Sequence, residues 1–148
     1  MRVVILDHKL FTMGLRLTLE TFGDCEVVGE ANTARAAFNV VRTLAPEVVV
    51  VDTVLRGLRT GNAIRKIRAC APGVRVLVLT EHGSIRDVAM AMAAGATGFA
   101  LKGDSIDEIL RAVQRVHLGR LYLSPSLDAG RETGPALRRP APFQEMSV

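Results

Sequence analysis

The chain has 148 residues, of which 49% are hydrophobic and 23% charged, and its formal net charge is +4. Length and composition of this kind are typical of one globular domain and exclude collagen, coiled-coil and largely disordered proteins. The first apolar run, residues 3–6, is far too short for a signal-peptide core or a membrane span, so we expect a cytoplasmic protein with no membrane partner. Cys25 and Cys70 lack the spacing of a zinc site and are interpreted as reduced thiols.

The positive charge does not by itself indicate nucleic-acid binding. Three arginines balance three acids from Ser126 onward, so the excess lies in the first 125 residues. It gathers only between Arg56 and Arg68, where five basic residues occur without an acid or an aromatic residue. Nucleic-acid platforms usually interleave bases with aromatic side chains. We interpret this stretch as a solvated basic face, with docking of a partner or of DNA as the alternative.

Strand and helix patterns alternate from the start of the chain. The run 3–6 predicts a strand that is buried on both faces. An apolar stripe at helical spacing follows over 10–22. A second strand is predicted at 26–31, and either polar residue at 32–33 can cap the next helix, over 34–44.

The middle of the chain continues the alternation. Four consecutive valines at 48–51 predict the strongest strand, because β-branched residues favour strands over helices. A helix is predicted from about 62 to 70, and the Pro72-Gly73 turn leads to a strand at 75–79.

Two helices and one strand complete the pattern. Ser84 can cap a helix with a predicted inner face of small or flexible residues, and we expect it to pack loosely: Ile85, Val88, Ala89 and Met92. A fifth strand is predicted at 98–101. Ser105 and Glu108 have the spacing of a capping box, which starts a helix with an apolar face made of Ile106, Ile109, Leu110, Val113 and Val116.

Five strands alternating with five helices predict an α/β fold, with a parallel sheet and right-handed crossovers. A sheet covered by helices on both faces explains the unbroken apolar strands. Four of the six prolines lie from Pro125 onward, among glycines and arginines. We therefore predict one domain over residues 1–125 and a linker or tail over residues 126–148.

Four residues that directly follow predicted strands are candidates for a site. These residues are Asp7, Asp52, Thr80 and Lys102. In an open α/β sheet, ligands bind in the crevice outside the carboxyl ends of the strands. Each residue alone has an ordinary interpretation, such as a helix cap or a solvated lysine, but together at one edge of a sheet they predict a site.

Several segments, in matching order and spacing, resemble those of a known family. They are Asp7-His8 with Leu10-Phe11 and Gly14-Leu15, Val27 to Ala31, Pro46 to Asp52, Val76 to Thr80, Ala94 to Phe99 with Leu101-Lys102, and Tyr122 to Pro125. The chain is similar over residues 2–125 to the receiver domains of bacterial response regulators. The similarity is greatest to transcription factors with a C-terminal LuxR-type helix-turn-helix.

This resemblance implies a flavodoxin-like three-layer α/β/α sandwich with a five-stranded parallel sheet of order 2-1-3-4-5. It implies that Asp52 accepts a phosphoryl group, that Thr80 and Lys102 contact it, and that Phe99 is the aromatic residue whose packing reports it. It also implies a sensor histidine kinase as a partner, homodimerisation, and DNA binding through a further domain that residues 126–148 would lead to.

The sequence departs from the family at the metal site. The usual receiver has two adjacent acids after its first strand, whereas Leu6-Asp7-His8 offers one. We therefore expect Mg²⁺ binding by Asp7, Asp52 and the backbone carbonyl of Val54 to be weak or absent. Two arginines near the acceptor, Arg56 and Arg59, are candidates for charge compensation.

Two alternatives to a phosphorylated signalling receiver follow from the sequence. The chain could be a phosphorylation-independent receiver that dimerises constitutively or senses a small molecule, as the missing acid and Arg56 suggest. An enzyme on the same fold is disfavoured, because Val54 stands where an aspartate-nucleophile phosphatase has its second acid. His8 is interpreted as an ordinary polar loop residue rather than a ligand.

Overall fold

The computed structural model describes residues 1–53 and 59–127. These ranges do not include Val54, Arg56 or the segment 128–148, whose roles are predicted from the sequence alone. The strands are β1 (Arg2–Leu6), β2 (Glu26–Ala31), β3 (Val48–Val51), β4 (Arg75–Thr80), β5 (Gly98–Leu101) and β6 (Tyr122–Leu123). The helices are α1 (Lys9–Phe22), α2 (Ala34–Leu44), α3 (Thr60–Cys70), α4 (Ile85–Ala94) and α5 (Ile106–His117). Within the described ranges, none of these helices is long and apolar enough to cross a bilayer.

All strands are parallel, and their order is β2-β1-β3-β4-β5-β6. The predicted α/β class and the order 2-1-3-4-5 are confirmed. The predicted number of strands is one too low, because Tyr122 and Leu123 add a short strand beside β5. Two residues are too few to produce a recognisable strand pattern, so this edge pairing could not be foreseen.

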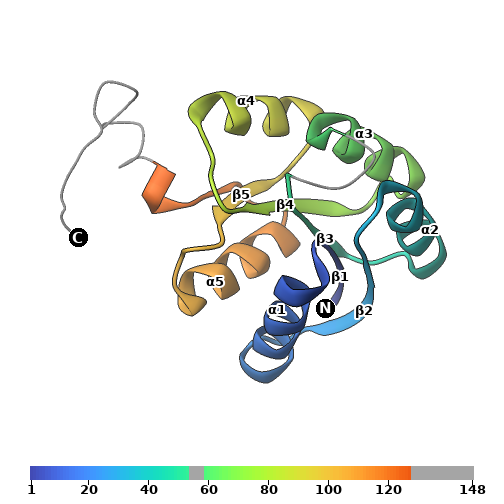
Figure 1. Ribbon diagram of the computed structural model, residues 1–148, viewed down its shortest axis with the longest axis horizontal. Coiled ribbons are helices and arrows are strands. Elements are labelled where there is room, and N and C mark those ends of the chain that lie inside the picture. Colours follow the sequence, from blue (N-terminus) through green and yellow to red (C-terminus); the bar gives the residue numbers. More distant parts are fainter. Residues whose placement is uncertain (54–58, 128–148) are drawn as a thin grey trace.

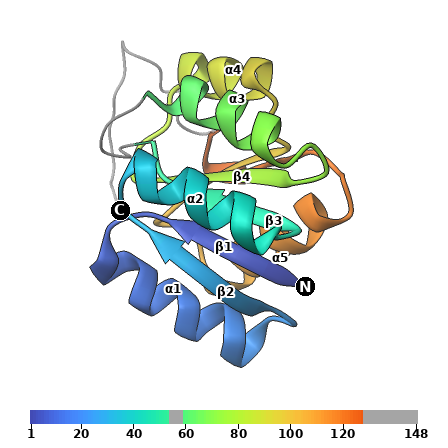
Figure 2. The same ribbon diagram turned by 90° about the vertical axis from the view of Figure 1, so that its right-hand side faces the viewer.

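Helices cover both faces of the sheet (Figures 1 and 2). Helices α1 and α5 lie on one face, and α2, α3 and α4 lie on the other. The strand side chains alternate between the two cores. In β1, for example, Val4 and Leu6 pack toward α2 and α3, whereas Val3 and Ile5 pack toward α1 and α5.

Some predicted helix faces are wrong in detail. Phe22 and Ile106, expected to face inward, are exposed because they lie at the last position of α1 and the first of α5. In α4 the buried residues are Ala91 and Ala94, whereas Ile85 and Ala89, both expected to face inward, are exposed. Because α4 is rich in alanine, its sequence does not mark a single apolar face.

Helix caps occur where the sequence offers them. Thr33, rather than Asn32, caps α2 by accepting a hydrogen bond from the Ala36 backbone at 3.2 Å. The predicted capping box of α5 is present. Ser105 Oγ accepts from the Glu108 backbone at 3.1 Å, and the Ser105 N–H donates to Glu108 Oε1 at 2.9 Å.

Replacing the capping serine, Ser105→Ala, should lower the free energy of unfolding by about 1 kcal/mol, because the first turn of α5 loses its hydrogen-bond acceptor. Urea unfolding followed by circular dichroism measures this. Thr18→Ala is the control, since the Thr18 hydroxyl only donates back to Gly14 O within α1 and its loss should change stability by less than about 0.5 kcal/mol. Equal effects of the two substitutions would contradict the capping role.

Candidate functional site

The parallel sheet aligns the polar residues that follow its strands. In the register of β1 and β3, Leu6 lies opposite Val51, and the Asp52 N–H donates to Leu6 O at 3.0 Å. The Lys102 N–H likewise donates to Thr80 O at 2.8 Å. The backbone pairing therefore continues one residue past β3 and past β5, which fixes the backbone positions of Asp52 and Lys102.

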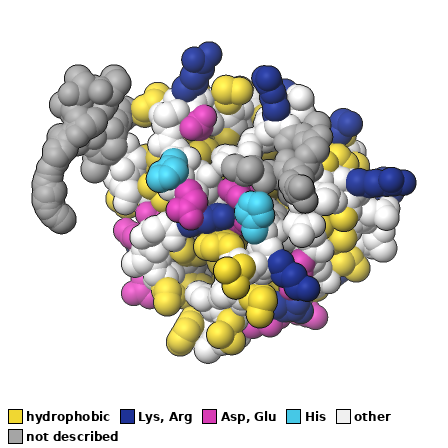
Figure 3. Space-filling view, in the orientation of Figure 1, with side chains coloured by type: hydrophobic (Ala, Val, Ile, Leu, Met, Phe, Trp, Pro, Cys, Tyr) yellow, Lys and Arg dark blue, Asp and Glu magenta, His cyan; other side chains and the backbone are white. Residues whose placement is uncertain are grey.

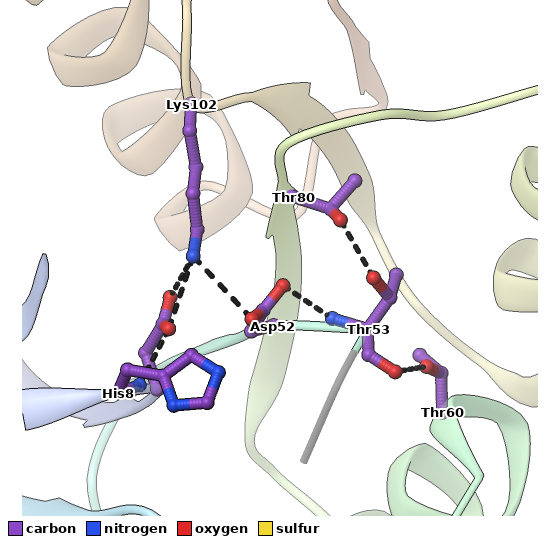
Figure 4. Close-up of polar contacts among 7 residues, drawn as sticks. His8, Asp52, Thr53, Thr60, Thr80 and Lys102 are labelled. Atoms are coloured by element: carbon purple, nitrogen blue, oxygen red, sulfur yellow. Dashed lines mark hydrogen bonds and ion pairs between the residues drawn. The ribbon is translucent and has the colours of Figure 1, made fainter.

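The Lys102 ammonium lies between two buried carboxylates (Figure 4). Its Nζ is 2.9 Å from Asp7 Oδ2 and 3.3 Å from Asp52 Oδ2. Asp7 and Asp52 are each only 4% exposed. The lysine side chain thus crosses the two strand spacings between β5 and β3, as its length allows.

The pocket opens on the face shown in Figure 3. Acidic and histidine side chains gather there around a basic side chain, with hydrophobic side chains next to them. The Lys102 ammonium also lies 4.2 Å from the centre of the Phe11 ring in α1. The ring face therefore adds an electrostatic attraction to the lysine.

Each carboxylate also accepts a backbone hydrogen bond. Asp7 Oδ1 accepts from the His8 N–H at 2.6 Å and from Lys102 at 3.0 Å. Asp52 Oδ1 accepts from the Thr53 N–H at 2.7 Å. These bonds orient the carboxylates, and they leave one lone pair on Asp7 Oδ2 and one on each Asp52 oxygen without a donor from the described residues.

Thr80 is connected to Asp52 through a residue that the sequence analysis did not single out. The Thr80 and Thr53 hydroxyl oxygens lie 2.6 Å apart, and the Thr53 N–H donates to Asp52 (Figure 4). Thr60, at the start of α3, donates to the Thr53 carbonyl at 2.8 Å. No sequence pattern marks Thr53, because its contacts depend on residues that are far away in the chain.

The pocket has a net negative charge. Two carboxylates and one ammonium sum to −1, and burial disfavours each charge. Burial raises the pKa of Asp7 above its usual value. The hydrogen bonds from Lys102 and from the His8 backbone offset this rise only in part, and the negative charge of Asp52 adds to it.

Among the residues that the structure describes, one group of side chains could hold a metal ion. Asp7, His8 and Asp52 each offer a ligand atom, and these atoms all lie within 4.8 Å of one another. Mg²⁺ favours a shell made entirely of oxygen atoms. Two carboxylates with an imidazole nitrogen as the third donor therefore fit this ion poorly. Arg59 is exposed and makes no ion pair with the residues that the structure describes, so its compensating role stays a prediction.

Phe99 points into the core. It is fully buried in the same cluster as Leu127. Both side chains lie against the backbone of Gly83, where an added Cβ would be 2.5 Å from Phe99 Cε1 and 3.4 Å from Leu127 Cδ2. Leu127 lies beyond the predicted domain boundary at residue 125, so the packed core includes part of the segment that follows β6.

Asp104, which the sequence analysis overlooked, joins the Lys102 loop to the same segment. Its Oδ2 accepts from the Leu101 N–H at 3.0 Å. Its Oδ1 accepts from the Ser124 hydroxyl at 2.9 Å and from the Ser126 hydroxyl at 3.3 Å. Ser124 is buried, so this hydrogen bond is shielded from water.

Comparison with known proteins relates this arrangement to bacterial signalling. The transcriptional regulatory protein MctR of Rhizobium johnstonii is 36% identical over 124 residues, which are 83% of this chain and 58% of that protein. The chain spans 56–58% of the length of the first curated relatives it matches.

Solved structures agree in fold. A LuxR-family two-component response regulator from Aurantimonas sp. SI85-9A1 superposes with a TM-score of 0.81 at 28% identity, covering 92% of this chain and 97% of that one. The signal receiver domain of the putative response regulator NarL from Mycobacterium tuberculosis gives a TM-score of 0.75 at 33% identity, covering 80% and 97%.

The family model for the response regulator receiver domain matches residues 3–114. This match contains all four strand-end residues of the pocket. The chain therefore belongs to the response regulator receiver domain family, and its relatives are regulators of the LuxR and NarL type.

Proposed function

We propose that this chain is the signal-input domain of a two-component transcriptional response regulator and that Asp52 accepts a phosphoryl group. The observation that carries the proposal is the Lys102 ammonium, 3.3 Å from the buried Asp52 carboxylate. A buried acid at the end of a parallel strand, with an ammonium and hydroxyls beside it, suits an acyl phosphate, whose oxygens need donors.

The proposed reaction needs little from the protein beyond position and charge. A lone pair of an Asp52 oxygen attacks the phosphorus of the donor, and the bond between phosphorus and the donor's leaving atom breaks, with its electron pair going to the donor. Lys102 and Thr80 then donate to the phosphoryl oxygens. For Thr80 this requires the 2.6 Å contact with Thr53 to open or to be shared. A sensor histidine kinase would supply the phosphoryl group.

The output belongs to the same proposal. Phosphorylation would favour homodimerisation and so control DNA binding by a linked helix-turn-helix domain. Residues 126–148 would be the linker after a receiver domain of residues 1–125, with Leu127 near its start packed into the core of that domain. All of this would take place in the cytoplasm, without a membrane partner. The regulator names of the relatives support this output. They do not favour the phosphorylation-independent alternative, and the family is one of signalling modules rather than classical enzymes.

Incubation with acetyl phosphate should add the mass of one phosphoryl group to the intact protein. The variant Asp52→Asn should add none. Thr80→Val should slow labelling by up to about tenfold, because one hydrogen-bond donor to the phosphoryl group is lost. Intact-protein mass spectrometry gives the extent of labelling, and sedimentation velocity of the same samples gives the fraction of dimer.

Glu47→Gln is the matched control for the acid-to-amide change, because Glu47 precedes β3 and so lies at the opposite edge of the sheet. Its labelling should equal that of the native chain. Labelling of Asp52→Asn at the native rate would disprove Asp52 as the acceptor. Complete labelling without any dimer would disprove the proposed output alone.

A further prediction concerns the free energy of unfolding that is lost because the Asp7 carboxylate is buried in the pocket. Because the pKa of Asp7 is raised in the folded chain, the unfolded state loses its proton first as pH rises. Stability is therefore lost as pH rises through about 3.9, the usual aspartate pKa, toward the raised value. Asp7→Asn should unfold at higher urea concentration than the native chain at pH 7, and this gain should vanish below about pH 3.9. The same variant should label more slowly with acetyl phosphate.

Urea unfolding at several pH values, in EDTA, tests this trade-off. Asp24→Asn is the control, since Asp24 is exposed and its replacement should change stability by less than about 0.5 kcal/mol at any pH. A loss of stability in Asp7→Asn at pH 7 would show that the ion pair with Lys102 outweighs burial.

A further inference from the structure

We infer that the pocket binds a divalent transition ion of the cobalt-to-zinc range through Asp7, Asp52 and the imidazole of His8, in preference to Mg²⁺. Nitrogen ligands such as imidazole suit these ions, whereas Mg²⁺ favours oxygen. The single acid after β1 thus changes which metal the site accepts, rather than only weakening the site. The inference concerns the pocket of the proposed function, but it does not require Asp52 to be phosphorylated.

The geometry of the three donors supports this inference. Two ligands bonded at about 2.0–2.2 Å to one ion lie roughly 3 to 4.4 Å apart. The donor atoms here lie within 4.8 Å of one another, so small side-chain rotations bring them onto a common ion. His8 is exposed and can make such a rotation, and Figure 4 shows its ring in the neighbourhood of Asp52.

The carboxylates have room for the ion despite Lys102. One lone pair on Asp7 Oδ2 and one on each Asp52 oxygen receive no hydrogen bond from the described part of the chain. With His8 neutral, the donors and Lys102 sum to −1. A divalent cation makes the pocket +1, which leaves it suited to an anionic ligand such as a phosphoryl group.

The place of His8 in the fold favours a ligand role over a structural one. It is the N-cap residue of α1, a position that prefers serine, threonine, aspartate or asparagine. Its side chain makes no capping hydrogen bond. The imidazole therefore does not stabilise the helix it precedes, and it stays available beside two carboxylates.

Isothermal titration calorimetry of the unphosphorylated, EDTA-treated chain with Co²⁺ and with Mg²⁺ tests the inference. The native chain should bind Co²⁺ at least a hundredfold more tightly than Mg²⁺. His8→Asn should weaken Co²⁺ binding by at least tenfold and change Mg²⁺ binding by less than about threefold. Co²⁺ is paramagnetic, so one equivalent should also broaden the His8 ring resonances in an NMR spectrum before those of His82.

His82→Asn is the matched control, because His82 is also exposed but does not belong to the donor group. It should bind both ions as the native chain does. The inference is overturned if the two histidine variants lose equal affinity for Co²⁺. It is also overturned if Co²⁺ binding is insensitive to His8→Asn, as it would be if the ion bound at Cys25 or Cys70. Such a result would not affect the phosphorylation of Asp52 that the proposed function predicts. Conversely, metal binding can still be measured if Asp52 is not phosphorylated.

Discussion

One ammonium between two buried carboxylates determines the chemistry of this domain. Burying a charge without a partner is costly, and two neighbouring buried aspartates repel each other. Lys102 makes the pair tolerable, at 2.9 Å from Asp7 and 3.3 Å from Asp52. The three residues follow β1, β3 and β5. Their contact therefore depends on a sheet in which β1 lies beside β3, and β5 lies two strands from β3. The strand order, rather than the conformation of any loop, therefore determines which residues form the pocket.

The strands and the residues that end them were predictable from the sequence for a physical reason, whereas the strand order was implied only by the resemblance to the receiver family. A parallel strand covered on both faces is an unbroken apolar run, and the polar residue that ends the run lies at the ligand-binding edge. Val48–Val51 followed by Asp52 is the clearest case. Elements without such a contrast were missed or misread: β6 has only two residues, and α4 buries alanines that differ little in size from their exposed neighbours.

The side-chain contacts of the site could not be predicted in the same way. Thr53 and Thr80 are 27 residues apart, and Asp104 and Ser124 are 20 apart. Each pair depends on rotamers that only the folded sheet selects. His8 shows another limit: the sequence placed Asp7 and Asp52 in one site but gave His8 only as an ordinary loop residue, and the structure shows that its imidazole lies near both carboxylates. Sequence thus identified the edge of the sheet that matters, and structure identified the partners.

The pocket is also joined to the C-terminal end of the described chain. Leu101, the neighbour of Lys102, donates to Asp104, and Asp104 accepts in turn from Ser124. In the same strand, Phe99 packs in one cluster with Leu127. Both polar and apolar contacts therefore hold this short segment. Packed cores change between discrete arrangements rather than deforming continuously. A charge added at Asp52 that displaces Lys102 would act on β5. The segment that β5 holds leads directly to the residues after 127, so a change in β5 would be passed on to them.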